Sequence, residues 1–280
     1  MESLVSTQWL EEALGSPDLR VIDATIFLPN SGRNPRAEFE AEHIPGAVFM
    51  DLDEIVDSAS PLPHMLPPAE KFASRMQTLG LGDGSRFVVY DNSPLHSAAR
   101  AWWMLRSFGA HHVAILDGGL QKWKAEGRPL ESGTRQVRHA HFTPMFDADA
   151  VADLDYVSGL VHSEAHEIVD ARPASRFAGE DPEPRPGVSP GHIPGSRSLP
   201  QSSLFNSDNT WRRDEELRRA FAEAGVDLSK PMVATCGSGV TAAVLLFGAH
   251  LLGKEDVKLY DGSWSEWGAD PSTPKATGTA

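Results

Sequence analysis

Residues 232–252 read MVATCGSGVTAAVLLFGAHLL and carry the most informative pattern in the chain. The apolar run 232–235 is typical of a buried β-strand, and the long apolar stretch after it predicts a helix over 240–252. Cys236 begins the short glycine-containing loop that joins the two. A strand, a glycine loop and a helix in this order predict a βα unit of an α/β protein, with Cys236 at the carboxyl end of the strand.

The loop after this strand is suited to hold an anion. Gly237 and Gly239 allow the backbone to curl so that successive N–H groups converge, and the following helix adds the positive end of its dipole. Such a field favours the thiolate, which is the reactive form of cysteine. A lone cysteine is more often a small buried apolar residue. Its position between a strand and a Gly-x-Gly helix start instead predicts that Cys236 is a nucleophile.

The same series of features occurs twice in the chain, at a spacing of about 145 residues. The shared features are a strand ending in Asp-Ala, a His-Ile-Pro-Gly turn, an apolar strand followed by a helix, and a short strand leading to an Asp-Gly turn. The matched segments are 21–24 and 168–171, 42–47 and 191–196, 87–90 and 232–235, 97–108 and 240–252, and 113–119 and 257–263. Short strands that alternate with helices predict a mostly parallel sheet flanked by helices in each copy.

This repeat sets the expected domain organisation. We expect two α/β domains over residues 1–135 and 154–280, joined by a linker over 136–153, where periodicity is weak. The Pro- and Gly-rich stretch 178–200 is expected to be a long ordered loop, and loops of that length in a compact domain are usually functional. The first copy has Asp91 at about the position of Cys236. Only the second domain is therefore expected to carry the cysteine chemistry.

Composition excludes several classes of protein. The 280 residues are 40% hydrophobic, and 25 Lys and Arg face 39 Asp and Glu, which gives a net charge of −14. This charge opposes binding to nucleic acids and to anionic membranes, but a local positive pocket for a small anion is still allowed. With one cysteine the chain forms no intrachain disulfide and no zinc site of several thiolates, and its histidines show no metal-ligand spacing, so we expect no metal.

The expected location is the cytoplasm. The first fifteen residues, MESLVSTQWLEEALG, lack the basic segment of a signal or transit peptide. The longest apolar run, 242–252, is interrupted by Gly248 and His250 and is too short to cross a bilayer. A cysteine loop before a helix also suggests a cysteine phosphatase, which uses a final arginine to hold phosphate. Position 242 is alanine and the loop is one residue tighter, so this alternative is disfavoured.

The doubled Asp-Ala, His-Ile-Pro-Gly and Asp-Gly pattern, with a cysteine only in the second copy, resembles the two-domain rhodanese superfamily of sulfurtransferases. The resemblance covers nearly the whole chain. The loop Cys-Gly-Ser-Gly-Val-Thr at 236–241 is similar to that of the 3-mercaptopyruvate branch, whereas thiosulfate-specific members carry Cys-Arg-Lys-Gly-Val-Thr. This difference is reasonable physically, because the thiosulfate dianion favours cationic side chains and the present loop is neutral.

The resemblance implies two tandem rhodanese-like domains, with the site in the cleft between them and the chemistry supplied by the second. Cys236 would take sulfur from 3-mercaptopyruvate as a persulfide and release pyruvate, and an acceptor such as thioredoxin, another thiol or cyanide would then remove the sulfur. No cofactor is implied. Two alternatives remain: a thiosulfate sulfurtransferase with an atypical loop, and a non-catalytic rhodanese-like binding module, which the intact Cys236 argues against.

The resemblance also implies substrate-binding residues. Arg176 and Arg185 match the two clamps for the substrate's carboxylate and carbonyl groups, a task that suits the planar fork of arginine. The loop contributes Gly237, Gly239, Val240 and Thr241 as further substrate-binding positions. Arg172 is interpreted as a surface ion pair, which is the usual state of an arginine.

A proton relay is the last implied feature. Asp53 and His64 lie in the Pro-rich segment 49–68 of the first copy, which is expected to form a rigid loop facing the other domain. The resemblance matches them, together with Ser238, to a Ser-His-Asp set in which the aspartate fixes the imidazole tautomer. Sequence spacing alone leaves this contact open.

Features common to both copies are interpreted as structural, since only one copy has a cysteine. His43 and His192 of the two His-Ile-Pro-Gly turns belong here, as do Asp23 and Asp170. The tryptophans of the apolar-periodic and domain-closing segments are expected in the core. They are Trp102, Trp103, Trp123, Trp264 and Trp267.

Overall fold

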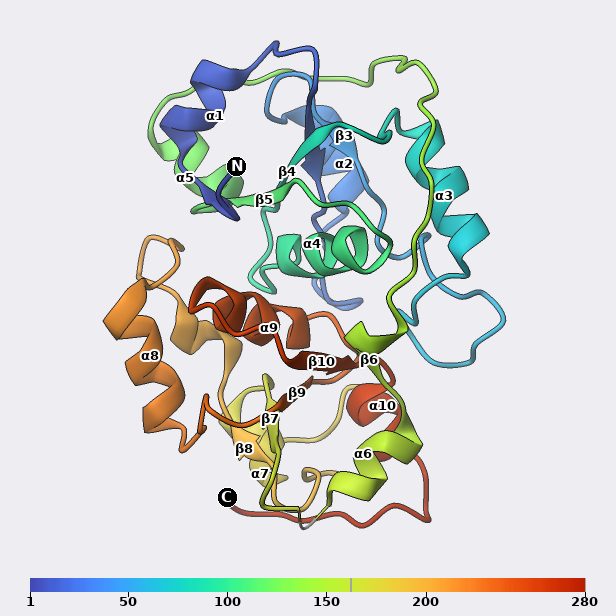
Figure 1. Ribbon diagram of the computed structural model, residues 1–280, viewed down its shortest axis with the longest axis vertical. Helices are drawn as coiled ribbons and strands as arrows, with labels where there is room; N and C mark the ends of the chain where they lie inside the picture. The colour runs from blue at the N-terminus through green and yellow to red at the C-terminus, as the bar shows by residue number, and fades with distance from the viewer. Residues whose placement is uncertain (162, 280) are drawn as a thin grey trace. The chain divides into compact units, whose positions relative to one another are not determined.

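A computed structural model describes residues 1–161 and 163–279 and divides the chain into two compact units (Figure 1). The first unit comprises Met1–Asp57, Leu66–Asp147 and Asn206–Trp211, and the second comprises Ser58–Met65, Ala148–Phe205 and Arg212–Ala280. The two copies of the repeat lie in different units. Residues 58–65, which include His64, group with the second unit although they come from the first copy. Residues 136–147, expected to be linker, group with the first unit.

The first unit has a five-stranded sheet. Its strands are β1 (Leu4–Val5), β2 (Leu19–Asp23), β3 (Val48–Phe49), β4 (Arg86–Tyr90) and β5 (Val113–Leu116). Its helices are α1 (Thr7–Ala13), α2 (Pro35–Ala41), α3 (Ala69–Thr78), α4 (Ala98–Ser107) and α5 (Gly119–Ala125). The strands run in the order β1-β5-β4-β2-β3 and every paired neighbour is parallel.

The second unit repeats this plan. Its strands are β6 (Val151–Ala152), β7 (Glu167–Asp170), β8 (Arg197–Ser198), β9 (Met232–Thr235) and β10 (Val257–Tyr260). Its helices are η1 (Ala148–Ala150), α6 (Leu154–Leu160), α7 (Ala174–Ala178), η2 (Gln201–Leu204), α8 (Asp214–Glu223), α9 (Ala242–Leu251) and α10 (Ser263–Trp267). The order β6-β10-β9-β7-β8 is that of the first sheet, strand for strand. The predicted fold class, two parallel-sheet domains flanked by helices, is confirmed.

Helices cover both faces of each sheet, which explains why the central strands are apolar throughout. In the first unit α1 and α5 lie on one side of the sheet and α4 on the other, and in the second unit α9 and α10 lie on opposite sides (Figure 1). The five tryptophans expected in the core are all buried. Among the described residues, no helix has both the length and the apolar character needed to cross a bilayer.

The two His-Ile-Pro-Gly turns have the same local structure. Nδ1 of His43 lies 2.7 Å from the carbonyl oxygen of Phe39, and its ring stacks on the Phe39 ring. Nδ1 of His192 lies 2.8 Å from the carbonyl oxygen of Phe177, and these rings also stack. The arrangement is the same in a unit with the cysteine and a unit without it, which confirms a structural role for both histidines.

Asp91 holds in the first unit the position that Cys236 holds in the second. Each residue directly follows the central strand, and its carbonyl oxygen accepts a hydrogen bond from the N–H of a residue at the start of the last helix of the unit. These donors are Leu120, at 3.0 Å from Asp91, and Trp264, at 2.9 Å from Cys236. The equivalence expected from the sequence is therefore confirmed.

The carboxylate of Asp91 fills its own loop. It accepts hydrogen bonds from the N–H groups of Ser93 at 2.9 Å and Ala98 at 2.8 Å. Burial raises the pKa of Asp91 to about 6, and these two N–H groups offset only part of that effect. In the first unit, therefore, amides of the loop are occupied by the carboxylate of the loop's own first residue.

This buried carboxyl group makes the stability of the chain depend on pH. The folded pKa is about 6 and the unfolded pKa is about 4, so the folded state binds the proton more tightly and Asp91 contributes more stability as pH falls from 7 towards 4. Asp91→Asn lacks this gain, so its melting temperature should fall further below that of the wild type at pH 5 than at pH 7. In the control Asp83→Asn the difference in melting temperature from the wild type should stay constant between pH 7 and pH 5. Hydrogen bonds from Thr143 lower the pKa of Asp83, so its contribution to stability changes only below the ordinary pKa of an aspartate. A gap for Asp91→Asn that is constant from pH 5 to 7 would contradict this account.

Candidate active site around Cys236

The Cys236 loop joins the end of β9 to the start of α9. Cys236 follows the last strand residue directly and is buried, with 2% of its surface exposed. The chain turns at Gly239, whose φ of +79° is in the left-handed region that favours glycine. The helix then begins at Ala242. The loop therefore places the thiol at the carboxyl edge of the sheet, beside a helix start, as the sequence predicted.

Ser263 fixes the curl of this loop from the side. Its hydroxyl accepts hydrogen bonds from the N–H of Cys236 at 3.3 Å and of Gly239 at 3.1 Å, and donates to the carbonyl oxygen of Tyr260 at 2.7 Å. Ser263 is fully buried and has a φ of +50°, which is strained for a residue with a side chain. Its counterpart in the first unit is Gly119, with a φ of +57°.

Four further amides of the loop remain available for a ligand. The N–H groups of Gly237, Ser238, Val240 and Thr241 donate to no acceptor among the described residues. The anion-binding group of amides that the glycine pattern predicted is thus smaller than the whole loop, because the amides of Cys236 and Gly239 already donate to Ser263. Unpaired backbone N–H groups beside a helix start attract anions.

A chain of alternating charges lies beside the loop. The guanidinium of Arg172 donates to both carboxylate oxygens of Asp170, at 2.7 to 3.1 Å, and to Glu183 at 2.8 Å. Glu183 also accepts from Arg176 at 2.5 Å. Arg172 lies over the ring of Trp264 and is 1% exposed. Its interpretation as a surface ion pair was wrong: the pair exists, but it is buried and it positions Glu183.

The two predicted clamp arginines both lie near Cys236. A Cβ atom placed on Gly237 would lie 3.5 Å from Nη2 of Arg176, and the buried Nε of Arg176 has no hydrogen-bond partner among the described residues. Nη1 of Arg185 donates to the hydroxyl of Ser265 at 3.3 Å, and that hydroxyl donates to the carbonyl of Gly237 at 2.5 Å. Burial and the neighbouring Arg176 lower the pKa of Arg185, whereas the charge of Cys236 raises it.

His64 and Ser238 meet in the second unit. Nδ1 of His64 lies 2.9 Å from Oγ of Ser238, although 174 residues separate them in the sequence. His64 has a φ of +60°, which turns the Pro-rich segment sharply at this point. Asp53 belongs to the first unit and is exposed, and its N–H donates to Oδ1 of Asp51 at 3.2 Å. The Asp53 member of the relay stays a prediction.

Three residues of this site were missed by reading the sequence. They are Glu183, which joins the two arginines, and Ser263 and Ser265, which hold the loop. The two serines follow the repeated Asp-Gly turn, and the replacement of Gly119 by Ser263 between the copies was a usable signal. Glu183 carried no signal, because a glutamate in a Pro-rich loop is usually solvated. Together these residues place the Cys236 thiol near guanidinium groups and unpaired amides, an arrangement that suits a small anion.

Comparison with known proteins gives the same picture over both units. The rhodanese-like domain family matches residues 6–126 and 153–270. The 3-mercaptopyruvate sulfurtransferase of Homo sapiens is 46% identical over 271 residues, which cover 95% of this chain and 91% of that protein. The mitochondrial thiosulfate/3-mercaptopyruvate sulfurtransferase 1 of Arabidopsis thaliana is 42% identical over 294 residues, covering 98% of this chain and 78% of that protein.

A solved structure has the same fold over almost the full length. The crystal structure of SseA from Escherichia coli, described as a 3-mercaptopyruvate sulfotransferase with the rhodanese fold, superimposes with a TM-score of 0.87. It is 42% identical in sequence, and the match covers 95% of this chain and 100% of that one.

The role of Ser263 is open to a direct test. Ser263→Gly removes the hydroxyl but keeps the left-handed backbone, as Gly119 does in the first unit, so the melting temperature should change little. The amides of Cys236 and Gly239 lose their acceptor, and their hydrogen exchange should become faster by roughly tenfold or more. The control Ser265→Ala removes a hydroxyl that accepts from neither amide, and it should leave both exchange rates unchanged. Unaltered exchange in Ser263→Gly would show that other contacts hold the loop.

Proposed function

Because the chain belongs to the rhodanese-like domain family, we propose that it is a sulfurtransferase that takes sulfur from 3-mercaptopyruvate. The observation that carries the choice of donor is the uncharged loop at Cys236, faced by the guanidinium groups of Arg176 and Arg185. Such a site holds a carboxylate beside the loop and the sulfur of the substrate inside it. Relatives named for this substrate match the chain along nearly its whole length.

Substrate binding uses the donors that the protein leaves uncommitted. Nε of Arg176 and Nη2 of Arg185 suit the carboxylate and carbonyl oxygens of a 2-oxo acid, because guanidinium N–H groups donate strong hydrogen bonds to such oxygens. Glu183 and Ser265 hold the two guanidinium groups in place before the substrate arrives. This preorganisation places the thiol of the substrate over the loop.

The chemical step transfers one sulfur atom. The thiolate of Cys236 attacks the sulfur of 3-mercaptopyruvate, an S–S bond forms, and the C–S bond breaks with its electron pair passing to carbon. The carbon product is the enolate of pyruvate, which takes up a proton to become pyruvate. The persulfide that remains on Cys236 lies among the unpaired amides of Gly237, Ser238, Val240 and Thr241, which stabilise its negative charge.

The Ser238 and His64 pair supplies a route for that proton. The 2.9 Å contact allows a proton to pass between the imidazole and the hydroxyl, which lies on the loop two residues after Cys236. Asp53 would fix the imidazole tautomer in this proposal. The pair is needed with a carbon leaving group, and less so with thiosulfate, whose leaving group is sulfite.

An acceptor thiol such as thioredoxin, or cyanide, completes the reaction by taking the outer sulfur of the persulfide and restoring the Cys236 thiolate. We place this reaction in the cytoplasm, where a lone catalytic thiol stays reduced. No cofactor takes part in either half of this scheme.

Thiosulfate is the competing donor, since two relatives are named for both substrates. The geometry disfavours the Cys-Arg-Lys loop of thiosulfate-specific enzymes here, because a side chain at position 237 would start 3.5 Å from Arg176. A cation at that position would be repelled by Arg176. The ratio of kcat/KM for 3-mercaptopyruvate to that for thiosulfate, measured with one acceptor, should therefore be well above one. A ratio below one would make the protein a thiosulfate sulfurtransferase.

The first prediction from this function concerns the persulfide. Incubation with 3-mercaptopyruvate should add ~32 Da to the protein, on the peptide that contains Cys236. Cys236→Ser should show no adduct and retain less than a few per cent of turnover, because its hydroxyl is not ionised near neutral pH. A wild type that forms no adduct and turns over neither donor would be a binding module.

A second prediction tests the proton route. Ser238→Ala and His64→Ala should each slow persulfide formation from 3-mercaptopyruvate by roughly 10²- to 10⁴-fold, the usual effect of one positioned proton-transfer group. The double variant should lose far less than the product of the two effects, because the two residues act as a unit. The rate with thiosulfate serves as the control and should fall much less. Multiplicative losses, or equal losses with both donors, would reduce His64 to a loop residue.

A further inference from the structure

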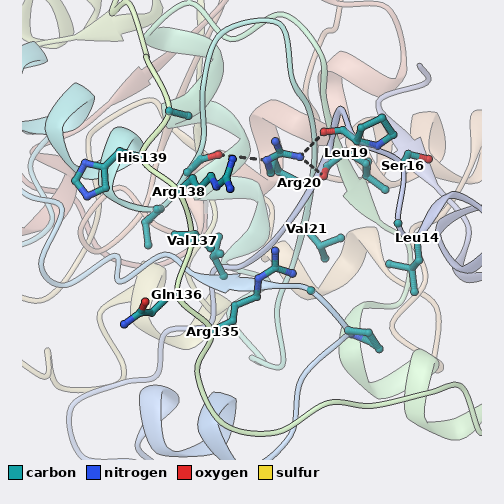
Figure 2. Close-up of a pocket in the computed structure, with 18 residues that line it drawn as sticks. Leu14, Ser16, Leu19, Arg20, Val21, Arg135, Gln136, Val137, Arg138 and His139 are labelled. Carbon is teal, nitrogen blue, oxygen red and sulfur yellow. Dashed lines mark hydrogen bonds between the residues drawn. The ribbon is translucent and has the colours of Figure 1, made fainter.

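The first unit contains a cavity of about 590 Å³ that the proposed reaction does not use. It lies between the start of β2, the turn before β3, the loop after α3, and the extended segment 135–140 (Figure 2). The apolar part of its lining comes from Leu14, Leu19, Val21, Val48, Leu79 and Val137. A volume of this size accommodates a small organic molecule.

The charged residues of the lining all have one sign. They are Arg20, Arg135 and Arg138, and none of the described residues that line the cavity is acidic. In a chain with a net charge of −14, a cavity with three guanidinium groups and no carboxylate is unusual. Figure 2 shows the guanidinium groups of Arg20 and Arg135 directed towards the middle of the pocket, with the Arg138 side chain beside Arg20.

Arg20 is fixed in position by the backbone. Its Nε donates to the carbonyl of Gly80 at 3.2 Å, and its Nη1 donates to the carbonyls of Pro17 and Leu19, each at 2.8 Å. Within the described part of the chain its Nη2 donates to nothing, and neither Arg135 nor Arg138 has a hydrogen bond or an ion pair. One anchored and two uncommitted guanidinium groups therefore border the same space.

Two glycines let the segment 135–140 pack against the unit and enclose the cavity. A Cβ on Gly80 would lie 2.9 Å from the carbonyl oxygen of Arg138, and a Cβ on Gly46 would lie 3.3 Å from Nη1 of Arg135. Both glycines have a positive φ. The segment is held at its end by the hydrogen bond from the N–H of Ala140 to Gln77. The arginines are thus placed on the cavity by backbone packing and not only by their own flexible side chains.

We propose that this cavity binds a small organic anion, with a phosphate or carboxylate group held by Arg20, Arg135 and Arg138 and an apolar body lying on the Leu and Val lining. The guanidinium groups supply paired donors for the oxygens of the anion, and the described lining of the cavity contains no carboxylate. The site lies within the first unit and does not depend on the proposed sulfur transfer at Cys236.

Calorimetry at fixed ionic strength tests the proposal with three probes. Phenyl phosphate and benzoate each join an anionic group to an apolar ring, and benzyl alcohol has the ring without charge. At least one of the two anions should bind to the wild type, at a stoichiometry of one when the Cys236 site is disabled by Arg185→Ala, and benzyl alcohol should not. The anion that binds more tightly identifies the preferred group as phosphate or carboxylate.

Variants locate the bound anion. Arg135→Gln combined with Arg138→Gln should weaken binding at least tenfold with an unchanged melting temperature. The matched control, Arg36→Gln combined with Arg106→Gln, removes two exposed positive charges of the same unit outside the cavity and should change binding less than twofold. Absence of binding by both anions, equal binding by the two double variants, or loss of all binding in Arg185→Ala would overturn the proposal.

Discussion

The loop around Cys236 keeps its shape because the hydroxyl of Ser263 satisfies three backbone groups at once. It accepts from the amides of Cys236 and Gly239 and donates to the carbonyl of Tyr260, so it joins the cysteine, the turn of the loop and the end of β10. The curl of the loop therefore exists before a ligand arrives, which is the condition under which backbone dipoles stabilise charge most effectively. The strained φ of Ser263 is a local cost of about 1–3 kcal/mol that the surrounding packing sustains.

The two units differ in how the loop after the central strand is held. In the first unit the equivalent of Ser263 is a glycine, and the carboxylate of Asp91 occupies the amides of its own loop. In the second unit the loop begins with Cys236, whose side chain leaves four amides unpaired. With the same strand order and turns, the first loop binds its own Asp91 carboxylate, and the second loop has amides that can bind an anionic ligand.

The strands and helices around Cys236 could be predicted from the sequence, because hydrophobic periodicity and turn residues determine local structure. The strand 232–235 is β9, and the helix expected at 240–252 is α9, with only its ends displaced. Contacts between distant segments had no such signal. The contact of His64 with Ser238 spans 174 residues, and its prediction depended on family resemblance. No pattern in residues 58–65 indicated that they would group with the second unit.

The error over Arg172 has a different origin, because its partner Asp170 is only two residues away, and the error changes the electrostatic argument. Most arginines in proteins are exposed, so a surface position was expected for Arg172, whereas the structure buries it between Asp170 and Glu183. Asp170, Arg172, Glu183 and Arg176 alternate in charge and sum to zero, so Arg185 is the cation without a compensating carboxylate in that chain. Burial and the neighbouring Arg176 lower the pKa of Arg185, which means that these surroundings destabilise its charged form. An anionic substrate reverses that destabilisation, and by linkage the same interaction tightens the binding of the anion.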